Sequence, residues 1–170
     1  GAGARLLGAQ LAAPLTDVKG IARRLDMVQH FVAGAPSSNN LRDDLRGLLK
    51  RCPDIERALS RLTLGRGGPR DLAAVRDGLA AAEEIKGIFE NAGTATSPGA
   101  SLGVPLGVPE GITDAIKGLG HHGALIDRFR RALAEDLPMY ARDGGFIAAG
   151  YASELDEFRA LRDESRRLIA

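Results

Sequence analysis

RDGGFI, at residues 142–147, divides the chain into two parts that differ in their pattern of apolar and charged residues. Before it, apolar residues recur three and four positions apart, which is typical of helices packed in a core. After it, an apolar face holds as far as Phe158, and charged residues then take most positions. A helix whose apolar stripe thins in this way is leaving its core for solvent or for a partner. We therefore predict an all-α protein with a helical bundle core over residues 1–150 and a long projecting helix over residues 151–170.

The projecting helix has no stop signal, because no Gly, Asn or Pro follows Leu168-Ile169. The chain also starts at Gly1 and has no initiator Met. We expect this helix to be truncated at Ala170 and the chain to be a piece of a longer protein.

The residues between the two parts are predicted to form a structural junction. Three nearby glycines, with a charged pair that can bond to the backbone, are typical of a tight and conformationally demanding turn. Residues 146–148 are the one plausible strand, and it is short. We favour a turn that sets the angle of the last helix over direct contact with a ligand. The predicted junction residues are Arg142, Asp143, Gly144, Gly145, Gly150 and Tyr151.

The composition is that of an ordinary globular domain rather than of a membrane or disulfide-rich protein. The 170 residues are 44% hydrophobic but only 4% aromatic, with no Trp, so the core must rest on aliphatic side chains, which favours helices. The net charge of +1 provides no global field toward nucleic acid or a membrane. No apolar run approaches the roughly 20 residues of a membrane span. The single Cys52 fits a reducing compartment, and we expect a cytoplasmic location.

Apolar periodicity and breaking residues place the helices of the core. The second predicted helix has a strong stripe, and we expect this stripe to pack in the core. Residues 93–109 are rich in Gly, Pro, Ser and Thr without any period, which predicts a long mobile loop. We expect the last core helix to end at Pro138. The predicted helices cover residues 3–13, 18–32, 41–52, 53–62, 70–90, 112–119 and 122–137, and the stripe of the second consists of Val18, Ile21, Leu25, Val28 and Val32.

No combination of residues points to catalysis, and we predict no catalytic, cofactor-binding or metal-binding residue. The glycines of residues 65–68 lack a preceding strand, so we favour a turn between helices over a phosphate-binding loop. His121 and His122 lack a third ligand at metal-binding spacing, which favours surface histidines. Acidic pairs such as Glu83-Glu84 and Asp156-Glu157 are expected on solvated, ion-pairing faces. Arginine ridges at 57–70 and 128–131 lack interleaved aromatics, so DNA-binding residues remain unknown.

Short motifs along most of the chain resemble one known family. The motifs are modest singly, but their order and spacing are specific: Gly3-Ala4-Arg5-Leu6-Leu7, Pro14-Leu15, Arg24-Leu25-Asp26, Pro53-Asp54-Ile55-Glu56-Arg57, Pro69-Arg70-Asp71-Leu72, Arg142-Asp143-Gly144-Gly145-Phe146-Ile147, Gly150-Tyr151, Leu155-Asp156-Glu157 and Arg159. Together they are similar to the core domain of bacterial DNA mismatch repair proteins of the MutS family. The likeness covers the first half of that core domain and the start of its lever helix, except for residues 93–118. The sequence departs from the family pattern at Gln10, where many members have Trp, and at residues 93–109, which are longer and richer in Gly and Pro than is usual.

The resemblance implies a mechanical role. In that family an all-helical core carries long lever helices to a clamp that closes on DNA, and the full-length protein is a homodimeric, DNA-dependent ATPase that uses ATP and Mg and binds mismatched duplex DNA. The clamp, the ATPase and the second half of the core would all lie outside this chain and would be its partners. No catalytic residue of the family carries over to any position here, so the chain itself is expected to be no enzyme and to hold no cofactor.

A different class of function stays open as the alternative. A free-standing helical adaptor could bind a protein partner through its C-terminal helix, with no clamp or ATPase attached.

Overall fold

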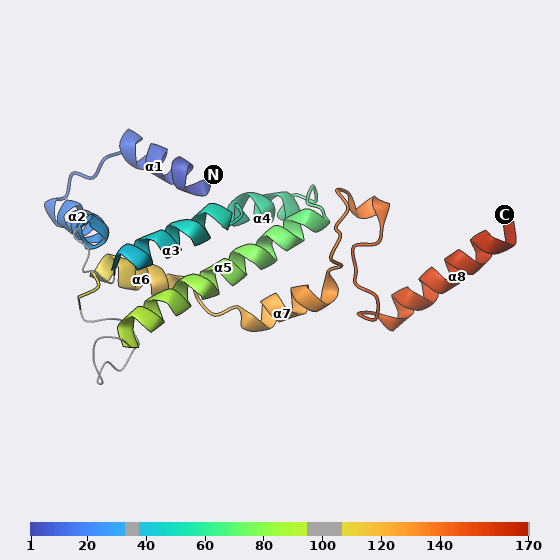
Figure 1. The fold of residues 1–170 in the computed structure, drawn as a ribbon. Coiled ribbons are helices and arrows are strands. Elements are labelled where there is room, and N and C mark those ends of the chain that lie inside the picture. The colour runs from blue at the N-terminus through green and yellow to red at the C-terminus, as the bar shows by residue number, and fades with distance from the viewer. Residues whose placement is uncertain (33–37, 95–106, 170) are drawn as a thin grey trace.

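A computed structural model of the chain describes residues 1–32, 38–94 and 107–169 and consists of helices and their connections (Figure 1). Within these ranges no strand forms, and the β-type contact present is an isolated antiparallel bridge between Leu133 and Ile147. The predicted all-α fold, with at most a short strand near residues 146–148, is confirmed. In chain order the elements are α1 (Ala2–Ala12), α2 (Val18–Val32), α3 (Ser38–Arg51), α4 (Ile55–Thr63), α5 (Pro69–Thr94), α6 (Glu110–Gly118), α7 (Gly123–Ala132), the 3-10 helix η1 (Ala141–Asp143) and α8 (Ser153–Ile169).

The central element is α5, which packs against α3, α4 and α7 (Figure 1). Proline suits the first position of this helix because its missing N–H would have no partner there. The Gly68 amide before it donates to the Asp71 carboxylate at 2.8 Å, which satisfies a further free donor at the helix start. At 26 residues, α5 is long enough to contact helices along its whole length.

A buried apolar cluster lies where α3, α5 and α6 meet. Its buried members are Leu45, Phe89, Ile112 and Ile116, and partly buried side chains of α2 pack against them. Each such buried side chain stabilises the fold by roughly 1.5–3 kcal/mol relative to an exposed one. This cluster therefore joins α2 and α3 to α5 and α6.

The second helix packs through a different face from the predicted one, so the prediction of a buried stripe is wrong. Met27 and Phe31 contact the core cluster, and Gly111 of α6 lies so close to Met27 that a Cβ there would be 2.4 Å from the sulfur. The predicted stripe faces away from this contact and is exposed, at 38–77% for its five members. Periodicity identified an apolar face correctly but could not show which of two apolar faces meets the core.

The first helix is attached by charge rather than by apolar burial. No residue of α1 is buried, and Arg5 bonds to Asp54 at 2.6 Å and to Glu56 at 2.9 Å near the start of α4. Asp54 also caps α4, because its carboxylate accepts the Arg57 amide at 3.2 Å. Pro53, predicted in the first turn of this helix, instead precedes the cap.

Two predicted boundaries differ from the structure or are only partly described by it. We expected α7 to run to Leu137, before Pro138, but it ends at Ala132 because the buried Leu133 is extended and pairs with Ile147. The predicted mobile loop at 93–109 falls mainly on residues 95–106, which lie outside the described ranges, so its mobility remains a prediction. Among the helices that are described, none has the length and apolar character needed to cross a membrane.

The last helix, α8, leaves the bundle and extends away from it to the C-terminal end (Figure 1). None of its residues is buried. Everything that positions α8 therefore has to act at its N-terminal end.

Candidate functional site

The segment that leads to α8 is joined to the end of α7. The Ala148 amide donates to the Ala132 carbonyl at 2.9 Å, and the Ala134 amide donates to the Phe146 carbonyl at 2.9 Å. These two bonds flank the bridge between Leu133 and Ile147. Because α7 packs on α5, the bridge connects the segment before α8 to the centre of the bundle.

The turn between these two paired segments contains four of the predicted junction residues. Asp143 accepts the Tyr140 amide at 3.3 Å through its carboxylate, and the Arg142 guanidinium lies 4.7 Å from the centre of the Tyr140 ring. Gly144 has φ +70° and ψ −172°, a region that is essentially restricted to glycine, and Gly145 also has a positive φ of +75°. The backbone of the turn therefore favours glycine at positions 144 and 145.

The other two predicted junction residues lie directly before α8. Gly150 has a positive φ of +80°, and the half-exposed Tyr151 donates its amide to the Ala148 carbonyl at 3.3 Å. A Cβ built on Gly150 would meet no atom within 4 Å, so its backbone conformation rather than lack of space favours glycine here.

Two side chains of α8 that sequence reasoning missed hold this turn. The Asp156 carboxylate accepts the Gly150 amide at 2.7 Å, and Arg159 donates to the Ile147 carbonyl at 2.9 Å. The two side chains also bond to each other at 2.9 Å. Their spacing of three showed that they share a side of the helix. Nothing in the sequence showed that backbone groups of residues 147–150 would be their partners, and Asp156 was expected on a solvated face.

The loop before the junction rests on the N-terminal end of α5. Arg70 donates to the Leu137 carbonyl at 3.1 Å. A Cβ on Gly68 would lie 2.6 Å from the Met139 carbonyl oxygen, so only glycine permits this approach. The junction is therefore connected to α5 twice, directly through this loop and indirectly through α7.

The two histidines that we considered as metal ligands, His121 and His122, lie in the turn between α6 and α7. Lys86 of α5 is buried, and its ammonium donates to the Gly120 carbonyl and lies 2.8 Å from Nδ1 of His121. Glu83 accepts the His122 amide at 2.6 Å, and this bond is the main cause of its lowered pKa. No group of three or more metal-ligating side chains occurs in the part of the chain that the structure describes. Glu83, expected on a solvated face, thus has a structural role.

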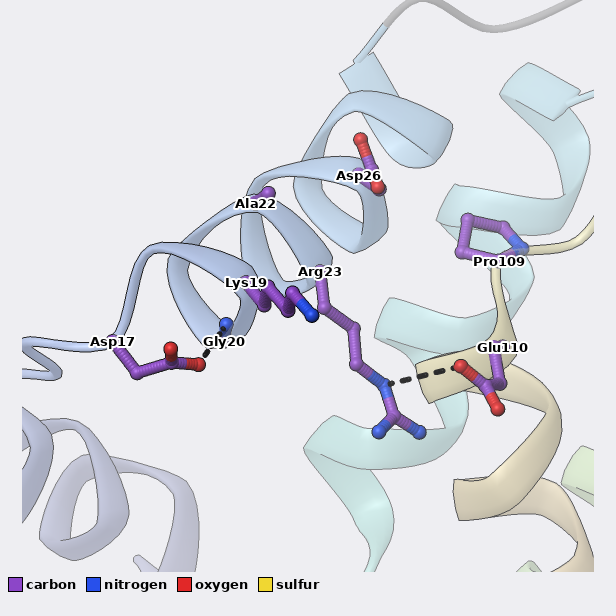
Figure 2. A pocket seen from close by; sticks show the side chains of 8 residues that line it. All are labelled: Asp17, Lys19, Gly20, Ala22, Arg23, Asp26, Pro109 and Glu110. Carbon is purple, nitrogen blue, oxygen red and sulfur yellow. Dashed lines mark hydrogen bonds and ion pairs between the residues drawn. The ribbon is translucent and has the colours of Figure 1, made fainter.

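A pocket of 740 Å³ lies between α2 and the start of α6 (Figure 2). Arg23 extends across it, with its Nε 4.0 Å from Glu110 and its guanidinium bonded to Asp114. Asp17 accepts the Gly20 amide at 2.7 Å and so caps α2. The charged lining carries both signs, and Arg23 pairs with Glu110 between α2 and α6, so the pocket offers no selective field to a ligand of one charge.

The arginine ridges are partly engaged in internal contacts. Arg61 lies 3.4 Å from the Asp71 carboxylate, and Arg70 holds the loop described above. Arg130 lies 3.8 Å from Asp127 on α7. The predicted turn at residues 65–68 joins α4 to α5, in agreement with the interpretation as a connection between helices.

Comparison with known proteins gives the family of this helical bundle. The family model described as MutS domain III matches residues 1–169. The chain belongs to the MutS domain III family. Relatives named DNA mismatch repair protein MutS include those of Rhodopseudomonas palustris (strain BisA53), which is 49% identical, Nitrobacter winogradskyi, 46%, and Roseobacter denitrificans, 44%. Each match covers 99% of this chain and 17% of the relative. The resemblance to MutS core domains is thus confirmed, and this MutS domain III chain spans about one sixth of the length of the relatives it matches.

Proposed function

We propose that this MutS domain III chain is the core-and-lever segment of a DNA mismatch repair protein and couples an ATPase to a DNA clamp. The observation that carries the proposal is the course of α8. It leaves the bundle without a buried residue and is attached at its N-terminal end to a junction that connects to α5. A stiff helix held at one end converts a small rotation at the junction into a larger displacement at its tip.

The cofactor and partners of this proposal belong to the whole protein. ATP and Mg would bind to an ATPase elsewhere in the polypeptide, and mismatched duplex DNA would be held by a clamp beyond α8. The relatives are named for DNA mismatch repair, which supports DNA as the partner of the whole protein. A homodimer and a cytoplasmic location complete the proposal. Nothing in the matches favours the alternative of a free-standing adaptor.

The test is to replace Gly144 or Gly145 by Val in the full-length protein. Both have positive φ, so each replacement forces the junction to change conformation at a cost of about 1–3 kcal/mol. We expect mismatch-stimulated ATP hydrolysis and DNA release to become uncoupled, while the basal ATPase rate is kept. The matched control is Gly65→Val, at a turn between α4 and α5 where φ is +68° and space is open. Unchanged coupling in the junction variants, or equal loss in the control, would contradict the proposal.

A second measurement separates a mechanical role from direct recognition of DNA. The chain is titrated with matched and mismatched duplexes at low and moderate salt. Binding through counterion release weakens steeply with salt, so we expect weak binding without preference for the mismatch that is lost at moderate salt. A salt-resistant preference for the mismatch would place recognition within this chain and would overturn a purely mechanical role.

A further inference from the structure

The attachment of α8 depends on two polar side chains. Among the hydrogen bonds of α8 side chains in the described ranges, those that leave the helix come from Asp156 and Arg159. The other bonded side chains, Arg162, Asp163 and Ser165, have partners within α8. Apolar anchoring is limited to the half-buried Leu155, since Phe158 and Leu161 are 67% and 59% exposed.

The geometry makes these two side chains a single unit. Each oxygen of the Asp156 carboxylate has its own partner, the Gly150 amide for one and Arg159 for the other. The second guanidinium nitrogen of Arg159 donates to the Ile147 carbonyl. Bonds to charged groups are stronger than neutral ones, and the planar guanidinium can serve two acceptors at once. The Asp156 side chain is 35% exposed and the Arg159 side chain 25%, so solvent reaches the unit and can compete for its hydrogen bonds.

The rest of the junction does not depend on this unit. The bridge between residues 132–134 and 146–148 is made by backbone groups alone. Gly150 lies between the bridge and α8, has a positive φ and has open space around it. Loss of the side-chain contacts would therefore free α8 to turn about Gly150 while the bridge stays paired.

We propose that Asp156 and Arg159 form a latch that fixes the direction of α8, and that opening of the latch lets α8 swing about Gly150. The latch is a regulatory device of the junction, and its consequence for coupling rests on the proposed function. In the closed state α8 moves with the bridge and α7 as one body. In the open state a rotation of the core no longer reaches the tip of the helix.

The test uses the full-length protein with Asp156→Ala or Arg159→Met. Arg162→Met and Asp163→Asn are matched controls, because that pair bonds at 2.8 Å within α8 only. Hydrogen exchange is followed in peptides covering 146–152 and, as an internal reference, 69–90. We expect exchange at residues 150–152 to become at least about tenfold faster in both latch variants and to stay unchanged in the controls and in the reference peptide. The Ala148 amide, which belongs to the bridge, should keep its protection. Arg159→Lys should restore protection only in part, since one ammonium cannot serve both acceptors as the guanidinium does.

Two outcomes separate the latch from the proposed function. Unchanged exchange in the latch variants, or equal acceleration in the α8 controls, overturns the latch. Acceleration confined to the junction establishes the latch. In that case, coupling between ATP hydrolysis and DNA release is measured on the same variants. Loss of coupling then supports the lever role as well, and retention of coupling overturns the lever role while the latch stands.

Discussion

Gly78 leaves no room for a side chain where α4 crosses α5. A Cβ at this position would lie 2.2 Å from Cγ1 of Ile55, so the two helices would have to separate. We expect Gly78→Ala to lower the free energy of unfolding by about 1–3 kcal/mol, the usual cost of overpacking. Gly87→Ala, in the same helix but with open space around it, should instead raise it by about 0.5–1 kcal/mol. Urea unfolding of both variants checks these two predictions. Destabilisation by Gly87→Ala would contradict the explanation by the space available at each glycine.

Asp54 gives the fold a pH dependence in the acid range. The hydrogen bond from Arg5 lowers the pKa of this carboxyl from 3.8 to about 2, because it favours the charged form. The ionised Asp54 carboxylate therefore contributes fully to the stability of the fold above pH 3.8, and this stabilisation is lost as the pH falls through about 2. Asp54→Asn should remove this part of the pH dependence while keeping the cap of α4, since Asn also caps helices. The free energy of unfolding is measured for the unchanged protein and for Asp54→Asn between pH 2 and 5. The difference between the two values should shrink toward acid, and a constant difference would exclude the ion pair as its cause.

The candidate site shows which single residues a sequence can predict. Gly144, Gly145 and Gly150 were recognisable because a positive φ selects glycine locally. Asp156 and Arg159 were not, because an acid and a base three positions apart occur on many solvated helices. Their role depends on backbone groups at Gly150 and Ile147 that come close only once the turn has formed.

For whole elements, periodicity predicted where helices lie but not what covers them. In α2 the stripe of Val18 and Leu25 is regular, yet the core contacts Met27 and Phe31 on another face. In α7 the apolar Leu133 continued the helical pattern, but its backbone pairs with Ile147 and the helix ends before it. Both differences arise from tertiary partners, and local pattern contains no information about them.

Replacement of the buried Lys86 tests how α5 holds the turn between α6 and α7. Its stem packs in the protein and its ammonium bonds to the Gly120 carbonyl. We expect Lys86→Ala to cost about 1–3 kcal/mol, because the carbonyl loses its partner and the packing of the stem is lost. It should also speed hydrogen exchange at residues 119–122. Lys50→Ala, at an exposed position of α3, is the control and should change stability by less than about 0.5 kcal/mol. Equal effects of the two variants, measured by thermal unfolding, would show that the buried contact does not stabilise the turn.

At the scale of the whole molecule, α1 and α2 expose many large apolar side chains. The exposed members are large, and they lie on consecutive helices: Leu6, Leu7 and Leu11 of α1, and Val18, Ile21, Leu25, Val28 and Val32 of α2. Monomeric proteins rarely expose large contiguous apolar patches. Exposed apolar side chains of this size favour contact with a partner.

The 170-residue chain by itself should therefore associate through α2. We expect sedimentation velocity to show complexes that grow with concentration, because burying exposed valine and leucine side chains is favourable. Leu25→Glu combined with Val28→Glu should shift the chain toward monomer without unfolding it, since these side chains are already 61% and 54% exposed. Arg24→Glu makes the same change in net charge at an exposed polar position of α2 and should leave association unchanged. Equal dissociation by Arg24→Glu would assign the effect to charge. A chain that stays monomeric at every concentration would show that this apolar face needs no partner.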